Sequence, residues 1–184
     1  MISVQIRLRI LIITSLIFSL TSCATAWVPS ETKPQLTQDQ GLLAIGFDQS
    51  RAESIKWGVI ARKGGGYSIH LSKLMEPGLS LKLYVAPAGT YCLTKYIGDL
   101  IEATFKNSLC TKVTAGRLSY FGHLSPVPFG GDIYQTFQYE LLYEELKTDY
   151  PDVFAQYAND LEKPRLNPVK DITPDSIRDL NHQK

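Results

Sequence analysis

The three cysteines of this chain, Cys23, Cys92 and Cys110, are the residues best suited to covalent chemistry. A cysteine thiol can be acylated, can attack a substrate as a nucleophile, or can form a disulfide. Cys92 and Cys110 lie in no C-x-x-C pair and have no catalytic motif partner, which disfavours redox and nucleophilic roles for them. The surroundings of each cysteine in the chain therefore decide its chemistry.

An apolar run precedes Cys23. Arg7 and Arg9 supply positive charge, Ile10 to Leu20 are mostly Ile, Leu and Phe, and small residues follow. Charge, apolar core and small residues in this order are typical of a secretory signal peptide. The core is about half as long as the roughly 20 apolar residues that a membrane-spanning helix needs. The sequence therefore predicts a removable leader over residues 1–22.

The end of this leader, Leu20, Thr21, Ser22 and Cys23, resembles the lipobox of bacterial lipoproteins. The resemblance implies that the Cys23 thiol is diacylated, that the chain is cut before it, and that the new amine is acylated. Several acyl chains hold a protein on a bilayer more firmly than one chain does. Ala24 stands where an Asp would resemble an inner-membrane retention signal, so we expect the outer membrane, facing the periplasm. The alternative is an ordinary secretory signal that ends in a cysteine.

Cys92 and Cys110 then remain as a pair in a compartment that oxidises thiols. A disulfide between them is the economical interpretation. Closing a loop of this length stabilises a fold by about 3 kcal/mol in the chain-entropy model. Two unpaired buried thiols are the alternative, because a sequence does not show whether two Cα atoms approach within about 7 Å.

Other site chemistry is weakly signalled. Strand alternation places His70 and His123 on polar faces, so we interpret the histidines, including His182, as surface residues. Their spacing suits no local metal site, and the triple glycine at 64–66 fits a hairpin turn better than a phosphate loop. No GxSxG, HExxH or comparable signature is present. We therefore expect no catalytic residue, no metal and no cofactor, with a carboxylate pair formed only in space as the alternative.

The charges exclude one class of partner. The chain has 19 Lys and Arg against 18 Asp and Glu, and the leader takes Arg7 and Arg9 with it. The remaining chain has no basic excess for binding nucleic acid. Basic residues stand singly apart from the pair Arg62 and Lys63, so the sequence predicts no polybasic patch beside the anchor. The lipid on Cys23 is then the expected link to the membrane.

The spacing of apolar residues changes along the chain and separates it into segments. Residues 23–40, rich in Pro, Thr and Gln, predict a flexible tether that holds the domain on the order of 20 Å from the bilayer. From Gly41 to Tyr139 the period is two, with turn residues recurring about every 8 to 12 positions. The expected strands are Leu42–Phe47, Ile55–Ala61, Tyr67–Leu71, Leu79–Val85, Thr90–Ile97, Ile101–Lys106, Cys110–Val113, Arg117–Leu124 and Ile133–Tyr139. Short sequential connections favour a mainly β fold, an antiparallel β-sandwich of about eight or nine strands.

After Tyr139 the period becomes helical, with apolar residues at i, i+3, i+4 and i+7. Pro151 and Asp152 predict the start of a second helix. We expect one domain over residues 41–162 that ends in one or two helices. An aromatic stripe is expected to pack these helices on the sheet, with a partner-binding interface as the alternative; it contains Tyr139, Tyr143, Tyr150, Phe154 and Tyr157.

The remaining residues, 163–184, have little to bury. We expect a loosely ordered tail there. Within it, Thr173, Pro174 and Asp175 have the types that cap a short helix carrying Ile177 and Leu180.

Two turn-and-strand patterns carry a family resemblance. Ala-Gly-Thr-Tyr at 88–91 precedes Tyr-Ile-Gly-Asp-Leu at 96–100, and Ala-Gly-Arg at 115–117 precedes Tyr-Phe-Gly-His-Leu at 120–124. With Pro87 and the helix start at Tyr150, they resemble a group of uncharacterised bacterial envelope lipoproteins. The domain of that group is similar to prealbumin-like or carboxypeptidase-regulatory-like β-sandwiches. The resemblance covers Gly41 to Tyr157, implies a fold, and transfers no catalytic residue.

These observations lead to an expected function. We expect a membrane-anchored bacterial lipoprotein without enzymatic activity that binds an envelope protein as an accessory component. The expected contact surfaces are the loop Pro126–Gly131 and the helices after Tyr139, since loops and edges carry most binding. The alternative is a periplasm-facing hydrolase or small-ligand carrier whose site forms from dispersed polar residues.

Overall fold

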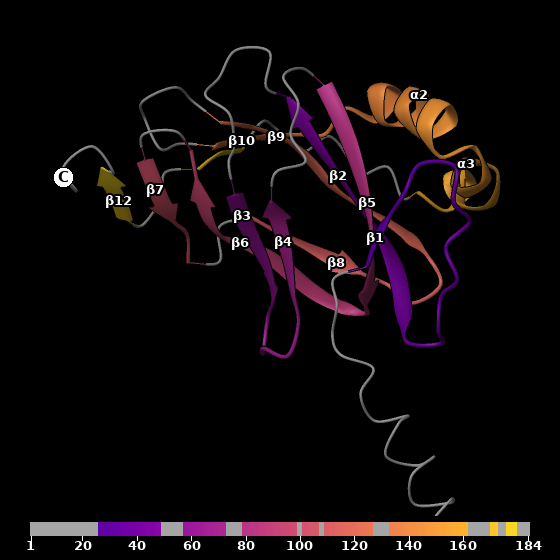
Figure 1. The fold of residues 1–184 in the computed structure, drawn as a ribbon, viewed down its shortest axis with the longest axis horizontal. Helices are drawn as coiled ribbons and strands as arrows, with labels where there is room; N and C mark the ends of the chain where they lie inside the picture. The colour runs from indigo at the N-terminus through magenta and orange to yellow at the C-terminus, as the bar shows by residue number, and fades with distance from the viewer. Residues whose placement is uncertain are drawn as a thin grey trace, which may run out of the picture.

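The computed structural model describes residues 26–48, 57–72, 79–98, 101–106, 109–126, 133–161, 170–172 and 176–179. They form a mainly β protein with two mostly antiparallel sheets and two α-helices (Figure 1), as the sequence predicts. Within this part of the chain, no helix is long and apolar enough to cross a membrane. The leader at 1–22, Cys23, most of the loop at 126–131 and His182 lie outside the described residues.

The first sheet has six strands in the order β1-β5-β2-β9-β10-β11. Their bounds are β1 Ala26–Val28, β2 Gln40–Asp48, β5 Leu79–Pro87, β9 Leu118–Pro126, β10 Ile133–Thr136 and β11 Lys170–Ile172. β2 and β9 pair in parallel, while the other neighbours pair antiparallel. β2 is flanked on both edges and is buried from Gly41 to Phe47, which explains its nearly continuous apolar sequence.

The second sheet has the order β12-β7-β6-β3-β4, and β8 also pairs with β6. Its strands are β3 Trp57–Arg62, β4 Ser68–Ser72, β6 Gly89–Ile97, β7 Ile101–Thr104, β8 Cys110–Val113 and β12 Ser176–Asp179. β7 pairs with the last residues of β6 and β8 with the first ones, so one long strand supports two short strands in succession.

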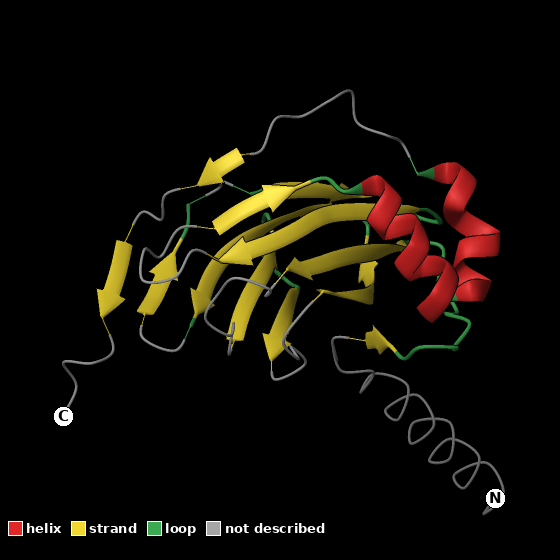
Figure 2. Ribbon diagram, turned by 90° about the horizontal axis from the view of Figure 1, so that it is seen from above, coloured by secondary structure: helices red, strands yellow, loops and turns green. Residues whose placement is uncertain are grey.

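Two apolar clusters lie on opposite faces of the first sheet. One joins the two sheets and includes Leu43 and Phe121 from the first sheet with Ile60 and Leu93 from the second. The other joins the first sheet to α2 (Tyr139–Asp149) and α3 (Pro151–Tyr157), which lie together beside it in Figure 2. The central strands of the first sheet are therefore covered on both faces.

The structure confirms the prediction that the aromatic stripe packs the two helices on the sheet. Leu142 and Leu146 of α2 and Val153 of α3 are buried against the first sheet, and Tyr150 and Tyr157 are buried with them. The aromatic residues of the stripe therefore belong to the apolar core between the helices and the sheet.

The segment expected to be a flexible tether is partly bound to the domain. Residues 26–28 form β1, antiparallel to β5, and Val28 is buried in the cluster under the helices. Further along, the backbone N–H of Glu31 donates to the carbonyl of Asp149 at the end of α2. The strand forms from the three apolar residues Ala26, Trp27 and Val28 of an otherwise polar segment, and pairing with β5 supplies its backbone hydrogen-bond partners.

The tail also differs from the expectation. Residues 170–172 form β11 beside β10 in the first sheet, and residues 176–179 form β12 beside β7 in the second. The prediction of a short helix that carries Ile177 is wrong, because that residue lies in β12 opposite Ala103. Both strands add to open sheet edges, which local sequence signals do not reveal.

Candidate functional site

A β-bulge in β9 turns two polar side chains toward α2. The pairing of β9 with β2 shifts after Tyr120, which leaves Phe121 as an extra residue, and Gly122 has a φ of 105° that favours glycine. The extra residue reverses the alternation of the strand. Tyr120 and His123 therefore share the helix-facing side, while Phe121 and Leu124 lie in the cluster between the sheets.

The His123 network joins β9 to α2. The His123 ring is fully buried, its Nδ1 contacts the hydroxyl of Tyr120, and its Nε2 lies 3.2 Å from Oε2 of Glu145. The Tyr120 hydroxyl also accepts the backbone N–H of Gln138 at 3.4 Å. The Tyr120 hydroxyl, the His123 ring and the Glu145 carboxylate therefore form a continuous series of polar contacts from β9 to α2. Every polar atom of the ring is thereby satisfied.

Gly46 and Gln135 adjoin the His123 network, the first by leaving space for the ring and the second by a hydrogen bond to the bulge. Gly46 of β2 pairs with His123, and a Cβ at Gly46 would lie 2.3 Å from the imidazole ring. The buried side-chain amide of Gln135 donates to the carbonyl of Phe121, so the backbone carbonyl of the bulged residue has a hydrogen-bond partner. A glycine inside a strand is a signal of bulging or close approach. Gly46 and Gly122 are therefore the sequence features that point to this site.

The His123 network has two possible roles, one catalytic and one structural. A hydroxyl, an imidazole and a carboxylate in series match the nucleophile, base and orienting acid of hydrolases. Here, however, Tyr120 is 7% exposed and the rings of Phe137 and Tyr139 lie 5.8 and 5.3 Å from its ring. Burial also raises the pKa of the Tyr120 hydroxyl, which keeps it protonated. This arrangement suits a polar tie between helix and sheet.

The prediction that His123 is a surface residue is wrong, because the second sheet and the helices cover the two faces of the first sheet. The bulge decides that the ring lies on the face toward the helices. His70 is exposed on β4, as predicted, with its ring 5.8 Å from that of Trp57. The two histidines lie in different sheets and do not meet. Across the described ranges, no group of three or more His, Cys, Asp or Glu is placed to hold a metal ion.

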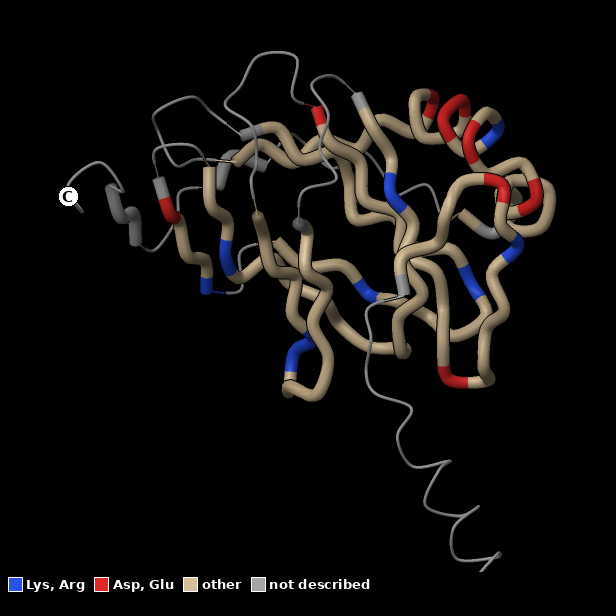
Figure 3. Tube along the Cα trace, in the orientation of Figure 1, with Lys and Arg blue, Asp and Glu red and all other residues tan. Residues whose placement is uncertain are grey.

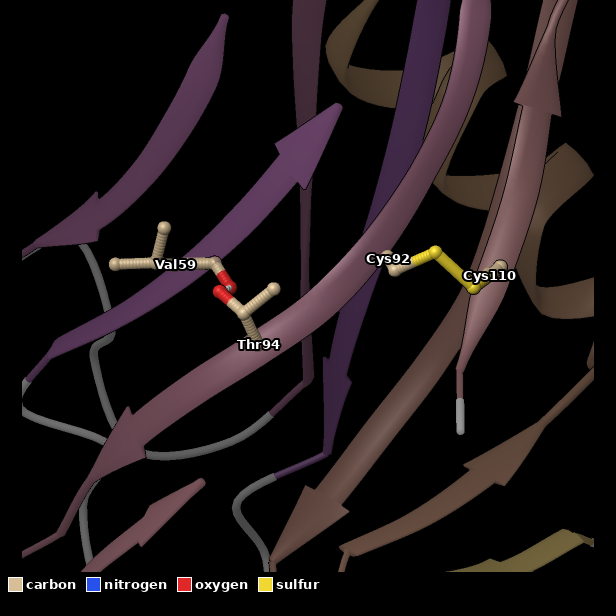
Figure 4. The surroundings of a disulfide bond; sticks show 4 residues. All are labelled: Val59, Cys92, Thr94 and Cys110. Atoms are coloured by element: carbon tan, nitrogen blue, oxygen red, sulfur yellow. Dashed lines mark hydrogen bonds between the residues drawn. A yellow bond between two sulfur atoms is a disulfide. The ribbon is translucent and has the colours of Figure 1, made fainter. Parts of the chain in front are cut away.

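The predicted disulfide is present. Cys92 and Cys110 face each other across β6 and β8, with Cα atoms 4.0 Å apart (Figure 4). Cys92 is buried and Cys110 is exposed. On the opposite edge of β6, the hydroxyl of Thr94 donates to the carbonyl of Val59 at 3.1 Å. The disulfide and this hydrogen bond therefore secure β6 to β8 along one edge and to β3 along the other.

An exposed aromatic residue marks the first strand. Trp27 of β1 is 39% exposed, and Nζ of Lys82 on β5 lies 5.6 Å from the centre of its ring. β1 begins at Ala26, three residues after Cys23. Within the described part of the chain, no carboxylate is paired with Lys82. A cation and an indole thus lie beside the expected point of attachment.

Comparison of the chain with protein-family models, with curated proteins and with solved structures finds no match.

Proposed function

We propose that this chain is a lipid-anchored bacterial envelope protein that acts as a non-enzymatic binding or accessory module. The observation that carries the proposal is the leader that ends in Leu20, Thr21, Ser22 and Cys23, followed within three residues by the first strand of a folded domain. A lipid on Cys23 would hold that domain at a membrane surface, and the outer membrane facing the periplasm is the proposed location.

We assign the two sheets to a β-sandwich of the prealbumin-like or carboxypeptidase-regulatory-like kind. Support comes from the apolar cluster that takes side chains from both sheets, including Leu43, Tyr84 and Phe121 from one and Ile60 and Tyr96 from the other. Interdigitating inner faces are the usual core of a sandwich. The helices are then an addition to the outer face of the first sheet.

The outer face of the helices is the proposed contact for an envelope partner. Glu140 and Glu144 on α2 and Asp152 on α3 are exposed, while the apolar residues of both helices face the sheet. An exposed acidic face favours a partner with a basic surface and speeds their encounter. The partner would then be a basic envelope protein that the anchor keeps close to the membrane.

Acylation of Cys23 is the first test. Cells grown with an alkyne-tagged fatty acid should label the wild-type protein and the Cys92→Ala/Cys110→Ala variant, but not Cys23→Ser. The double variant is the matched control, because it removes the other two cysteines and keeps Cys23. An unlabelled wild-type protein would show that the leader is an ordinary secretory signal.

Crosslinking in the native host, followed by mass spectrometry of the purified protein, tests the binding role. A stoichiometric partner should be captured by the wild type and lost in Glu140→Lys/Glu144→Lys. Lys106→Glu, a reversal of an exposed charge on another part of the molecule, should keep the partner. Capture that survives the double variant would exclude the helix face as the contact.

A hydrolase or small-ligand carrier remains the second candidate, and one observation favours it. Tyr120, His123 and Glu145 have the order of groups that activates a nucleophile. Hydrolysis of an ester probe that disappears in Tyr120→Phe and persists in Tyr143→Phe would support this candidate. If both variants and the wild type are equally inactive, the network is structural.

A further inference from the structure

Several turns far apart in the sequence meet at one end of the sheets. The β5–β6 turn lies beside the start of β2, since Ala88 N–H donates to the carbonyl of Asp39 at 2.7 Å. The turn before β9 lies beside the same strand, since Gly116 N–H donates to Gln40 at 2.8 Å. The β3–β4 hairpin joins them through Lys63 N–H, which donates to the carbonyl of Thr90 at 2.7 Å. We call this region, residues 38–40, 62–67, 87–90 and 112–117, the anchor end.

The anchor end carries more positive than negative charge. Lys63, Lys112 and Arg117 are exposed, and Arg62 is half-buried with its guanidinium donating to the carbonyl of Ala88 at 2.7 Å. In the described part of the chain, no carboxylate forms an ion pair with the three exposed residues. Asp39 is the acidic residue of this region, and the Thr37 hydroxyl that donates to it lowers the pKa of its carboxyl. Figure 3 shows the basic tip of the β3–β4 hairpin at the lower edge of the molecule.

The chain enters the domain at this same end. Ala26 pairs with Val85, two residues before Pro87, and Val28 pairs with Leu83, farther from the anchor end. Ala26 is the third residue after Cys23, and so short a segment spans at most about 10 Å. That span is close to the Debye length of about 8 Å at physiological ionic strength. A lipid on Cys23 would therefore hold the start of β1, at the end of the sheets where the exposed basic residues lie, near the charge of the headgroups.

We propose that the anchor end is a docking surface for an anionic lipid bilayer, so that the domain stands on the membrane with Lys63, Lys112 and Arg117 toward the headgroups. Trp27 lies beside the anchor and is exposed, and indole rings favour the interface between headgroups and water. The proposal rests on the proposed acylation of Cys23. It replaces the expectation, drawn from the scattered basic residues of the sequence, that the lipid alone is the link to the membrane.

The two tryptophans of the chain provide the measurement. Trp57 begins β3 while Arg62 ends it, so Trp57 lies away from the anchor end. Each indole has a lysine ammonium 5.6 Å from its ring centre, which matches their local surroundings. The variant Trp57→Phe reports on Trp27, and Trp27→Phe reports on Trp57. Both full-length proteins are purified from bacterial membranes and placed in vesicles of brominated phosphatidylglycerol or brominated phosphatidylcholine.

We expect fluorescence from Trp27 to be quenched at least twofold more in the phosphatidylglycerol vesicles than in the phosphatidylcholine vesicles. High salt should remove the difference, because it screens the headgroups. Trp57 should remain unquenched in both. Equal quenching of Trp27 in the two lipids, or quenching of Trp57 as strong as that of Trp27, would overturn the proposal.

A pair of charge variants assigns the effect to the anchor end. Lys63→Glu/Lys112→Glu in the Trp57→Phe background should abolish the difference between the two lipids. Lys106→Glu/Lys147→Glu changes the net charge equally at exposed residues elsewhere and should preserve it. Loss of the difference in both pairs, or in neither, would contradict a local docking surface.

Flotation separates this proposal from the acylation on which it rests. An acylated protein should float with phosphatidylcholine vesicles whatever its basic residues do. A protein that fails to float with them has no lipid, which refutes the proposed function. If such a protein still floats with phosphatidylglycerol vesicles at low salt and the Lys63→Glu/Lys112→Glu variant does not, the docking surface stands without the anchor.

Discussion

At the scale of single residues, two glycines in neighbouring strands allow the His123 network to form. Gly46 leaves the volume that the imidazole ring fills, and Gly122 takes a backbone conformation in which a Cβ would also lie 2.8 Å from Gln135. A larger residue at either position must displace a buried group, and cores as dense as organic crystals adapt poorly to extra atoms. The buried network thus depends on the absence of a side chain at Gly46 and Gly122 as well as on its own polar groups.

Gly46→Ala should lower the free energy of unfolding by about 1–3 kcal/mol, because the added methyl group overlaps the His123 ring. Urea denaturation measures the loss. Gly58→Ala is the control, since its Cβ would lie 3.3 Å from a Leu71 methyl group that can move. Equal losses in the two variants would mean that the ring has space to shift.

Tyr120→Phe should cost about 1–3 kcal/mol of unfolding free energy, because Nδ1 of the buried His123 loses its partner. Tyr143→Phe removes a hydroxyl that donates to Ala158 in a half-buried position, at 3.3 Å. It should cost less in the same urea denaturation experiment. A larger loss in Tyr143→Phe would contradict the role given to the network.

Stability should fall in strong alkali because of buried tyrosines. Burial raises the pKa of Tyr91 and of Tyr139 to about 12, whereas an unfolded tyrosine ionises near 10. Each therefore stabilises the fold fully below about pH 10, and this contribution disappears as the pH rises from 10 toward 12. Between pH 9 and about 12, tyrosinate absorbance should rise while the urea midpoint falls; a midpoint that stays constant to pH 12 would contradict the shifts.

At the scale of elements, long strands secure short ones. β6 has nine residues and supports both β7 and β8, which have four each. Cross-strand pairing over so few residues contributes little, so covalent closure at Cys92 and Cys110 supplies a large part of the stability of β8. Helices α2 and α3 are held differently, by apolar burial and by Glu145 contacting the buried His123.

Cys92→Ala/Cys110→Ala should lower the free energy of unfolding by about 3 kcal/mol, because the disulfide closes a loop with a sequence separation of 18 residues. Urea denaturation of the wild type with and without a reductant provides the comparison. The reductant should lower the wild-type midpoint to that of the variant and leave the variant unchanged. A wild type insensitive to the reductant would show that the bond contributes no stability.

At the scale of the whole molecule, the first described strand and the last two form edge strands of the sheets. β1 covers one edge of the first sheet, β11 covers the other edge, and β12 covers an edge of the second sheet. Unpaired edges expose backbone groups that can pair with another chain. The terminal segments therefore protect a mainly β fold against self-association.

Removal of residues 162–184 should expose the edges of β10 and β7 and cause self-association, measured by light scattering after size-exclusion chromatography. Tyr134 on β10 is 38% exposed, and Tyr134→Lys in the shortened chain should reduce the association by placing a charge on the edge. A shortened chain that stays monomeric would mean that other groups cover those edges.

Local periodicity determined most of the elements. The nine predicted strands correspond to β2 through β10, and the helices over 139–149 and 151–157 follow the predicted stripes. This is possible because alternation and the i, i+3, i+4 spacing are set by residues close in sequence. Alternation misleads in one strand. Leu83 and Tyr84 of β5 are both buried, because the helices cover the Leu83 face and the second sheet covers the Tyr84 face, which alternation assigns to solvent.

Local patterns in the sequence were enough for the mainly β class, and they predict a leader and an anchor at Cys23. They left the disulfide between Cys92 and Cys110 as one of two alternatives, which the structure resolves. Tertiary structure alone decided where β1, β11 and β12 pair, that a bulge turns His123 toward the helices, and that four scattered basic residues meet at one end. The physical reason is that these features depend on strand register between segments far apart in the chain, and no local propensity encodes register.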